Sequence, residues 1–168
     1  REALRRVRRG DIGQILLGEA HYPWRGGGRG GPPATHEEQL RTWYYVLPLS
    51  GDFIVEQFVH NLDIIRWVMQ ENPLRAFGMG GRQARVHPKF GHIYDHFAVE
   101  YQFPSGARCF ALDRHTEGSA GRIEEVFLGT KGQATIGLFG PWSIRVKGGE
   151  SWRFRDPKNN PYHQEHAE

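Results

Sequence analysis

The segment from Gly51 to about Gln70 constrains the fold most, because it is the clearest helix in the chain and is apolar around most of its circumference. At about 100° per residue, its polar side chains fall within one sector of about 80°. An ordinary surface helix instead carries a broad polar face. We therefore predict a helix buried on most sides, whose narrow stripe faces either a polar cleft or satisfied partners. The stripe consists of Asp52, Glu56, His60, Asp63 and Trp67.

Most of the remaining chain is predicted to form strands. Residues 92–103 alternate between apolar and polar, with Asp95 interrupting the apolar face, and a Pro104-Ser105-Gly106 turn leads into a returning strand at 108–114. A short helix at the start is expected to stop at Gly10. A helix early and an antiparallel meander late together predict an α+β fold. Further strands are expected at residues 11–20, 76–86, 123–128, 133–139, 143–146 and 152–155.

Length and charge exclude several classes of protein. The 168 residues suffice for one domain with a single core. The net charge is +3, but residues 1–9 hold five arginines and one glutamate, so the excess sits at one end and we expect no nucleic-acid partner. No apolar run approaches the roughly 18 residues of a membrane span, so no membrane partner is expected. Cys109 is the one cysteine, which excludes an internal disulfide and a cysteine-rich zinc site.

Glu56 and His60 are the first candidates for catalysis. Residues four apart lie on one helix face, where a carboxylate can hydrogen-bond an imidazole and fix its tautomer. Such a pair suits a general acid or base that works near neutral pH. The same spacing fits a Glu–His pair that merely caps a buried helix, and the spacing does not separate the two interpretations. Because no third ligand is obvious, we expect no metal.

The segment Gly51–Asp63 resembles the substrate-domain signature of the Gfo/Idh/MocA oxidoreductases, the glucose–fructose oxidoreductase and inositol dehydrogenase family. In that signature a glycine-led helix carries a carboxylate, a histidine four residues later and usually an aspartate three further on. This chain has Glu56 where the family usually has aspartate. Further similarity covers almost the whole chain, in the family's order, at Asp11–Gly13, Ile93–His96, Phe103–Gly106, Gly129–Gly132 and Asn160–His166.

The resemblance implies a full-length oxidoreductase that uses NAD or NADP on a sugar, cyclitol or related polyol. It implies an open, predominantly antiparallel sheet with helices on one face, the other face being available for a homo-oligomer. His60 would sit near the substrate carbinol with Glu56 beside it, because loss of hydride must be accompanied by loss of the hydroxyl proton. Strand residues expected to make one sheet face apolar enough to associate are Phe97, Val99, Tyr101 and Phe110.

The nucleotide-binding half is not evident in this sequence. No G-x-G-x-x-G motif opens a βαβ unit, and the family's Glu-Lys-Pro motif is absent. We expect residues 1–168 to be a single substrate-binding and oligomerisation domain, a fragment without the N-terminal Rossmann domain and the C-terminal helix. Such a fragment alone is expected to bind no cofactor and to be inactive.

Additional residues are candidates for contacting a polyol. Asp63, Tyr94, Asp95 and His96 accompany the family motifs, although a polar strand edge would look the same. Arg25 and Trp43 precede the helix and offer a guanidinium and an aromatic face, although loop packing explains them equally well. Two other functions remain open. One is a non-catalytic oligomerisation scaffold, and the other is transient redox in glycoside cleavage or epimerisation on the same fold.

Overall fold

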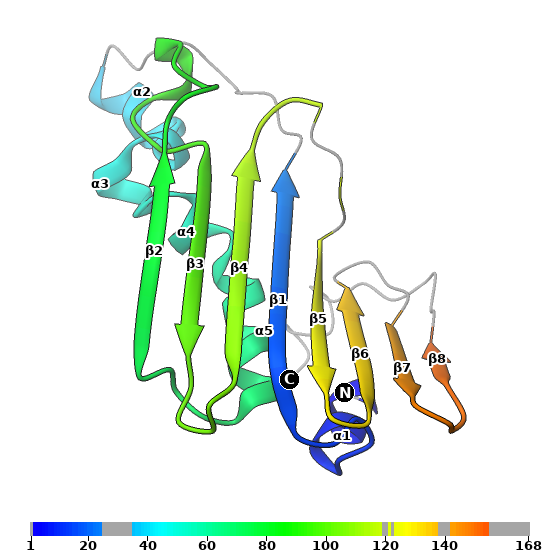
Figure 1. Cartoon of the computed structure of the whole chain (residues 1–168). Coiled ribbons are helices and arrows are strands. Elements are labelled where there is room, and N and C mark those ends of the chain that lie inside the picture. Colours follow the sequence, from blue (N-terminus) through cyan, green and yellow to red (C-terminus); the bar gives the residue numbers. More distant parts are fainter. Residues whose placement is uncertain (1, 25–34, 119–120, 122, 138–141, 155–168) are drawn as a thin grey trace.

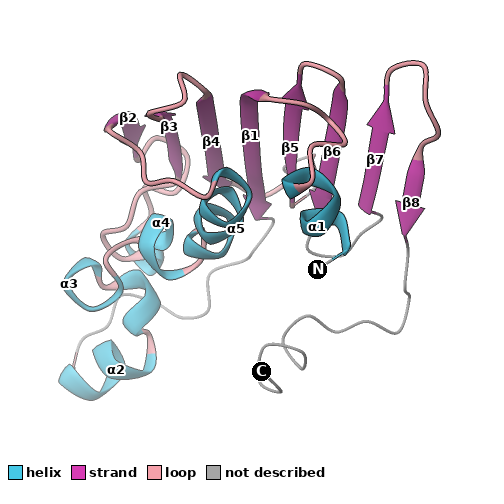
Figure 2. Ribbon diagram, turned by 90° about the horizontal axis from the view of Figure 1, so that it is seen from below, coloured by secondary structure: helices cyan, strands magenta, loops and turns pink. Residues whose placement is uncertain are grey.

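The structure, a computed structural model, describes residues 2–24, 35–118, 121, 123–137 and 142–154. The described chain forms two layers: an eight-stranded open sheet, and helices that pack on one of its faces (Figures 1 and 2). The α+β class and the mostly antiparallel open sheet are therefore confirmed. None of the helices in these described ranges is long and apolar enough to cross a membrane.

The strand order places the first strand of the chain in the middle of the sheet. The order is β2-β3-β4-β1-β5-β6-β7-β8. β1 runs parallel to β4, and the other neighbouring pairs are antiparallel. The strands are β1 (Ile15–Trp24), β2 (Arg75–Gly81), β3 (His96–Gln102), β4 (Arg108–His115), β5 (Glu124–Gly129), β6 (Gly132–Gly137), β7 (Trp142–Val146) and β8 (Trp152–Phe154).

The helices lie between and before these strands. α1 packs near β6 and β7, whereas α5 crosses β1 and β5. Two short 3₁₀ helices, η1 and η2, belong to the same layer as the α-helices. The bounds are α1 (Glu2–Arg8), α2 (His36–Arg41), η1 (Trp43–Tyr45), α3 (Leu47–Ser50), α4 (Phe53–Glu56), α5 (Val59–Met69) and η2 (Pro88–Phe90).

The core lies between the sheet and α5. Burial along β4 alternates strictly, because successive side chains of a strand point to opposite faces. The helix-facing residues include Cys109 and Ala111, which pair with Gly18 and Ala20 of β1. Phe127 continues this surface on β5, and α5 covers it with Ile65 and Val68.

The predicted single helix over 51–70 is wrong, because the chain breaks into α4 and α5 at Gln57 and Phe58. The carbonyl of Phe53 accepts the N–H groups of both Gln57 (3.1 Å) and Phe58 (3.0 Å), so one turn is widened by a residue. In a regular helix residues five apart point about 140° away from each other. The wide turn lets both Phe53 and Phe58 point into the core, where they are 0% and 1% exposed.

The exposed side of this segment is wider and more apolar than the predicted polar stripe. Val55 and Val59, beside the stripe, are 57% and 44% exposed, and Trp67 within it is 49% exposed. The buried positions of α5 are Asn61, Ile65 and Val68. The outer side of α4 and α5 is therefore an open surface of mixed apolar and polar residues in this chain.

The four strand residues expected on one associating face divide between two faces. Phe97, Val99 and Tyr101 point toward the helices, since they pair with Asp113, Ala111 and Cys109. Phe110 points the other way. No described element covers that second face, which we call the open face (Figure 2). Its exposed apolar side chains are Phe77, Met79, Phe110, Leu112 and Leu128.

One glycine brings the segment before β3 against η1. Gly91 has a φ of 62°, and a Cβ built there would lie 1.9 Å from the carbonyl oxygen of Tyr45. The next residue, His92, donates its N–H to that same oxygen at 3.1 Å. Any side chain at this position would separate the two segments, so glycine is required by both the conformation and the close approach.

Candidate functional site

Glu56 and His60 lie on the two sides of the helix break. Glu56 ends α4 and is half-buried, whereas His60 is in the first turn of α5 and is exposed. Burial raises the pKa of the Glu56 carboxyl, and the nearby His60 partly opposes that rise. No hydrogen bond joins the two side chains among the described contacts. The pair is electrostatically coupled, with the imidazole open to solvent.

Two other members of the predicted stripe differ sharply in burial. Asp63 lies almost one turn beyond His60 on α5 and is exposed. Asp52 is 5% exposed and begins α4, where its Oδ1 accepts the N–H of Phe53 at 2.8 Å. Its Oδ2 accepts the N–H of Tyr94 at 3.0 Å, so it ties α4 to the segment that enters β3. Asp52 is thus an anchor of α4.

A buried polar network underlies the break. The Oε1 of Gln57 accepts the hydroxyl of Tyr44 at 2.8 Å and lies 2.9 Å from the Nε2 of His115, the last residue of β4. The other ring nitrogen of His115 lies 3.2 Å from Nη1 of Arg85. His115 stacks on Phe53 with ring centroids 4.0 Å apart. One histidine of the sheet therefore contacts both α4 and the residue that follows it.

The titratable side chains in and beside this network have strongly shifted pKa values. Burial, assisted by Arg85, lowers the pKa of His115 to about 3, so this imidazole is neutral at physiological pH. Burial, with a smaller contribution from Asp52, raises the pKa of Asp113 to about 9. Neither oxygen of the Asp113 carboxyl has a hydrogen-bond partner in the described structure. Burial raises the pKa of Tyr44, and the negative charges of Glu56 and Asp113 raise it further.

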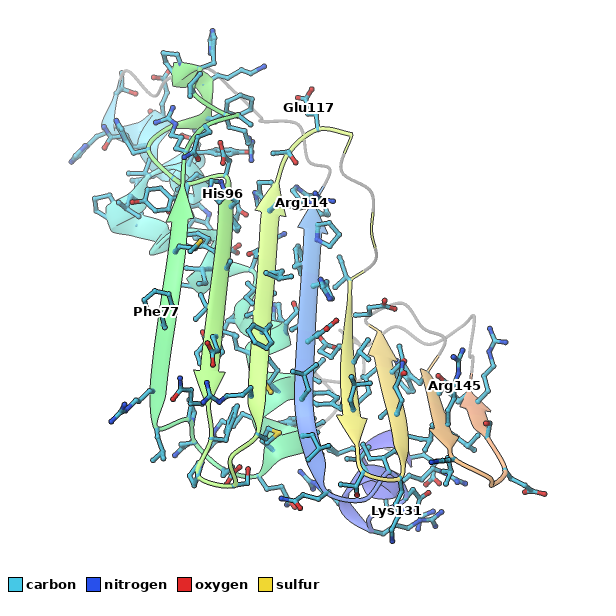
Figure 3. All side chains as sticks on the ribbon, viewed as in Figure 1. Phe77, His96, Arg114, Glu117, Lys131 and Arg145 are labelled. Atoms are coloured by element: carbon cyan, nitrogen blue, oxygen red, sulfur yellow. The ribbon has the colours of Figure 1, made fainter. Side chains whose placement is uncertain are left out.

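The remaining predicted site residues are not gathered around His60. Asp95 is 1% exposed and its Oδ2 accepts the N–H groups of residues 83, 84 and 85, which fixes the loop that carries Arg85. His96 donates its Nδ1–H to Asp95 Oδ1 at 2.7 Å, and it pairs with Arg114 on the open face (Figure 3). His96 therefore lies on the opposite face of the sheet from His60.

Tyr94 and Trp43 do lie on the helix side. The Tyr94 ring packs 5.4 Å from that of Phe97 and is 42% exposed. Trp43 is also 42% exposed and contacts Tyr44 edge to face, with centroids 6.3 Å apart. Arg25 lies outside the described residues, as does the whole Asn160–His166 motif.

Two features of the site could not be found by motif. Tyr44, Arg85 and His115 carry no recognisable pattern, and His115 is 58 residues away from Gln57 in sequence. A cavity of about 550 Å³, lined mainly by open-face residues, was also unforeseen. It lies on the far side of the sheet from His60. Its lining includes His21, Pro23, Leu112, Arg114, Gly121 and Glu124. Among the described side chains, no group of three or more potential ligands is arranged to hold a metal ion.

Comparison with known proteins gives one family match. The model of the GFO/IDH/MocA C-terminal domain matches residues 1–135. No curated protein sequence matches the chain.

Solved structures share the fold at low sequence identity. An aldose-aldose oxidoreductase from Caulobacter crescentus, complexed with glycerol, aligns with 95% of this chain at 21% identity and a TM-score of 0.70. A levoglucosan dehydrogenase in complex with NADH and levoglucosan aligns with 92% at 16% identity and a TM-score of 0.72. A super-repressor mutant of Gal80p from Saccharomyces cerevisiae aligns with 95% at 15% identity and a TM-score of 0.69. This chain spans 44%, 43% and 44% of those three chains, respectively.

Proposed function

Because this chain belongs to the Gfo/Idh/MocA C-terminal domain family, we propose that it is the substrate domain of an NAD(P)-dependent oxidoreductase. The substrate we propose is a sugar, cyclitol or related polyol. Support comes from the two oxidoreductases of the same fold, one complexed with glycerol and the other with levoglucosan and NADH. We propose that residues 1–168 form one substrate-binding and oligomerisation domain, with the Rossmann domain preceding it.

The described residues of this chain do not fit a nicotinamide cofactor. A dinucleotide fold presents a glycine-rich turn between a parallel strand and a helix, so that backbone N–H groups hold the pyrophosphate. Here the helices α2, α3, α4 and α5 begin after Thr35, Val46, Asp52 and Phe58, and none of these starts is such a turn. We therefore propose that the helices named here contribute to binding the substrate and accepting its proton rather than to holding the cofactor.

The observation that carries the proposal is the coupled Glu56–His60 pair on the outer side of the helix break. Oxidation of a carbinol releases the hydroxyl proton, and an exposed imidazole is a suitable base for it. The Glu56 carboxylate would stabilise the imidazolium that results. Asp63 follows on the same side and is free to accept a hydrogen bond from a second hydroxyl. The exposed valines and Trp67 around the pair offer apolar surface for the substrate or for an adjoining domain.

We also propose a homo-oligomer formed through the open face. Phe77 and Met79 are 69% and 65% exposed there, and Leu112 is 43% exposed. Polar contacts lie among them, including the ion pair of Arg108 with Glu100 and a hydrogen bond between His21 and Glu19. A mixed surface of this kind resembles a protein interface more than a solvated sheet face.

A non-catalytic role is the second candidate, because the super-repressor mutant of Gal80p has the same fold. The test is steady-state kinetics on the polypeptide that joins this domain to its cofactor-binding domain. His60→Ala should lower kcat by roughly 10² or more, the usual effect of losing a general base. Glu56→Gln should lower kcat by less, because Glu56 orients the base without taking the proton.

His36→Ala is the matched control, since His36 is an exposed histidine of α2. It should leave kcat unchanged, and thermal melting should show all three variants folded. Equal rates for His60→Ala and His36→Ala would refute the assignment. The absence of any polyol-dependent NAD(P)H formation by the unmodified protein would favour the non-catalytic role.

A further inference from the structure

One side chain of the sheet, that of His115, contacts the wide turn between α4 and α5. Gln57 is the residue that widens this turn, and its side chain points inward although its neighbours Glu56 and Val55 belong to the outer side. Inside the fold, Gln57 meets the hydroxyl of Tyr44 and the imidazole of His115. The turn therefore depends on contacts from β4 and η1 in addition to its own backbone hydrogen bonds.

The hydrogen-bond directions in this network follow from Arg85. A guanidinium has donors and no acceptor, so the His115 Nδ1 that faces Arg85 must carry a lone pair. The single proton of the neutral ring is then on Nε2, which donates to Gln57 Oε1 at 2.9 Å. The Tyr44 hydroxyl donates to the same oxygen at 2.8 Å. With two donors directed at it, the amide of Gln57 has one orientation.

Arg85 is itself held in place by its surroundings. It is 5% exposed, and its guanidinium carbon lies 4.2 Å from the centroid of the Phe90 ring. The loop that carries it is fixed by Asp95, which accepts the backbone N–H of Arg85 at 2.8 Å. The chain of contacts from Asp95 to Gln57 thus runs through Arg85 and His115, which are 5% and 1% exposed.

We propose that His115, oriented by Arg85, is a positioning residue for the Glu56–His60 pair: by donating to Gln57 it fixes the wide turn that separates the two side chains. The inference rests on the proposed function for its catalytic meaning. Its structural basis is independent, because Glu56 immediately precedes Gln57 and His60 follows three residues later. Rotation of the turn would change both the distance from Glu56 to His60 and the burial of Glu56.

Two substitutions separate hydrogen bonding from packing at this position. His115→Phe keeps an aromatic ring stacked on Phe53 but removes both hydrogen bonds. His115→Gln loses the ring but retains a carbonyl oxygen to face Arg85 and an amide N–H to face Gln57. A positioning role predicts that His115→Gln behaves like the unmodified chain and that His115→Phe does not. A packing role predicts the reverse.

The readout is the pKa of Glu56, followed in the full chain by carboxyl ¹³C NMR titration. As a single substitution, His60→Ala should raise the pKa of Glu56, because His60 lowers that pKa. In the His115→Phe background that rise should disappear, and in the His115→Gln background it should persist. Persistence of the rise in His115→Phe, or its loss only in His115→Gln, would overturn the proposal.

Gln57→Met provides a second route should His115→Phe fail to fold, since it removes the acceptor at a half-buried position. It should abolish the His60-dependent rise, and an unchanged rise would count against the proposal. In the two-domain enzyme, His115→Phe should lower kcat about 10-fold with little change in KM, as a misplaced catalytic group does. The NMR result does not depend on turnover, so a failure of the proposed function remains distinguishable from a failure of this inference.

Discussion

Glu125 offers a sharp test of the physical reasoning, because it is a carboxyl placed where a charge is costly. It lies on the helix face of β5 and is 1% exposed. Its Oε1 accepts the amide of Asn61 on α5 at 2.5 Å, and its Oε2 has no partner in the described structure. Burial raises its pKa from 4.5 to about 8, despite the hydrogen bond from Asn61.

The effect on stability follows from proton linkage. Between pH 4.5 and about 8 the folded state holds a proton that the unfolded chain has released. The free energy of unfolding therefore falls as pH rises through this interval, by up to about 1.4 kcal/mol per pH unit, and levels off above it. At pH 7 the free energy of unfolding is therefore lower by about 3 kcal/mol than it is below pH 4.5.

Glu125→Gln imitates the protonated carboxyl and should remove this dependence. The second amide hydrogen lacks a partner, which costs about 1 kcal/mol at every pH. Relative to the unmodified chain, we expect the free energy of unfolding of Glu125→Gln to be unchanged near pH 5. It should be higher by about 2 kcal/mol at pH 7 and by more at pH 8.5. Urea denaturation followed by circular dichroism at the three pH values measures these differences.

Glu117→Gln is the matched control for the same chemical change. Glu117 is exposed in the turn after β4 (Figure 3), so its substitution should alter the unfolding free energy by less than about 0.5 kcal/mol at each pH. A Glu125→Gln variant that is less stable than the unmodified chain at pH 8.5 would refute the reasoning. It would mean that the carboxylate is solvated or paired in solution.

Four further predictions use the same structure. Asp113→Asn should also stabilise the chain at neutral and alkaline pH, because the pKa of Asp113 is raised to about 9, and urea midpoints at pH 6 and 9 measure this gain. The unfolding free energy should also fall as pH drops from 6.5 toward 3, since folded His115 resists the proton that the unfolded chain takes up, and His115→Gln should flatten that acid limb in the same assay. Gly91→Ala should cost at least about 2 kcal/mol in urea unfolding, because a Cβ would meet the Tyr45 carbonyl. Cys109 is buried with a pKa raised to about 12, so a thiol reagent should label it only after denaturation.

Much of the sheet could be predicted because burial follows the two-residue period of a strand. The returning strand predicted at 108–114 is confirmed as β4, and the turn at residues 104–106 joins it to β3. The same period misled us about Phe110, whose face depends on register with the neighbouring strand. Phe110 pairs with Glu100, which points away from the face of Phe97 and Val99, and a one-residue difference in register reverses the face of every side chain in a strand.

The helix break could not be predicted from a search for one regular period. A local signal did exist: Phe53 and Phe58 are both large and apolar, and a regular helix cannot bury both. The side chain that holds the wide turn, His115, lies on the sheet and far away in sequence. The Glu56–His60 pair was found from helical spacing and supported by family resemblance, whereas the network beneath it required three-dimensional contacts. Buried groups such as Asp113 resemble ordinary strand aspartates until their surroundings are known.

The central position of β1 has a consequence for synthesis of the protein. Leu17 pairs with Arg108 on one side and Leu128 on the other, 91 and 111 residues later. At about 5–20 residues per second, a ribosome needs roughly 5–20 s to produce those partners. During that time the strand has both edges unsatisfied, which is the condition that favours association with other nascent chains. Production of this domain in cells should therefore respond to translation speed and to chaperones that shield β1.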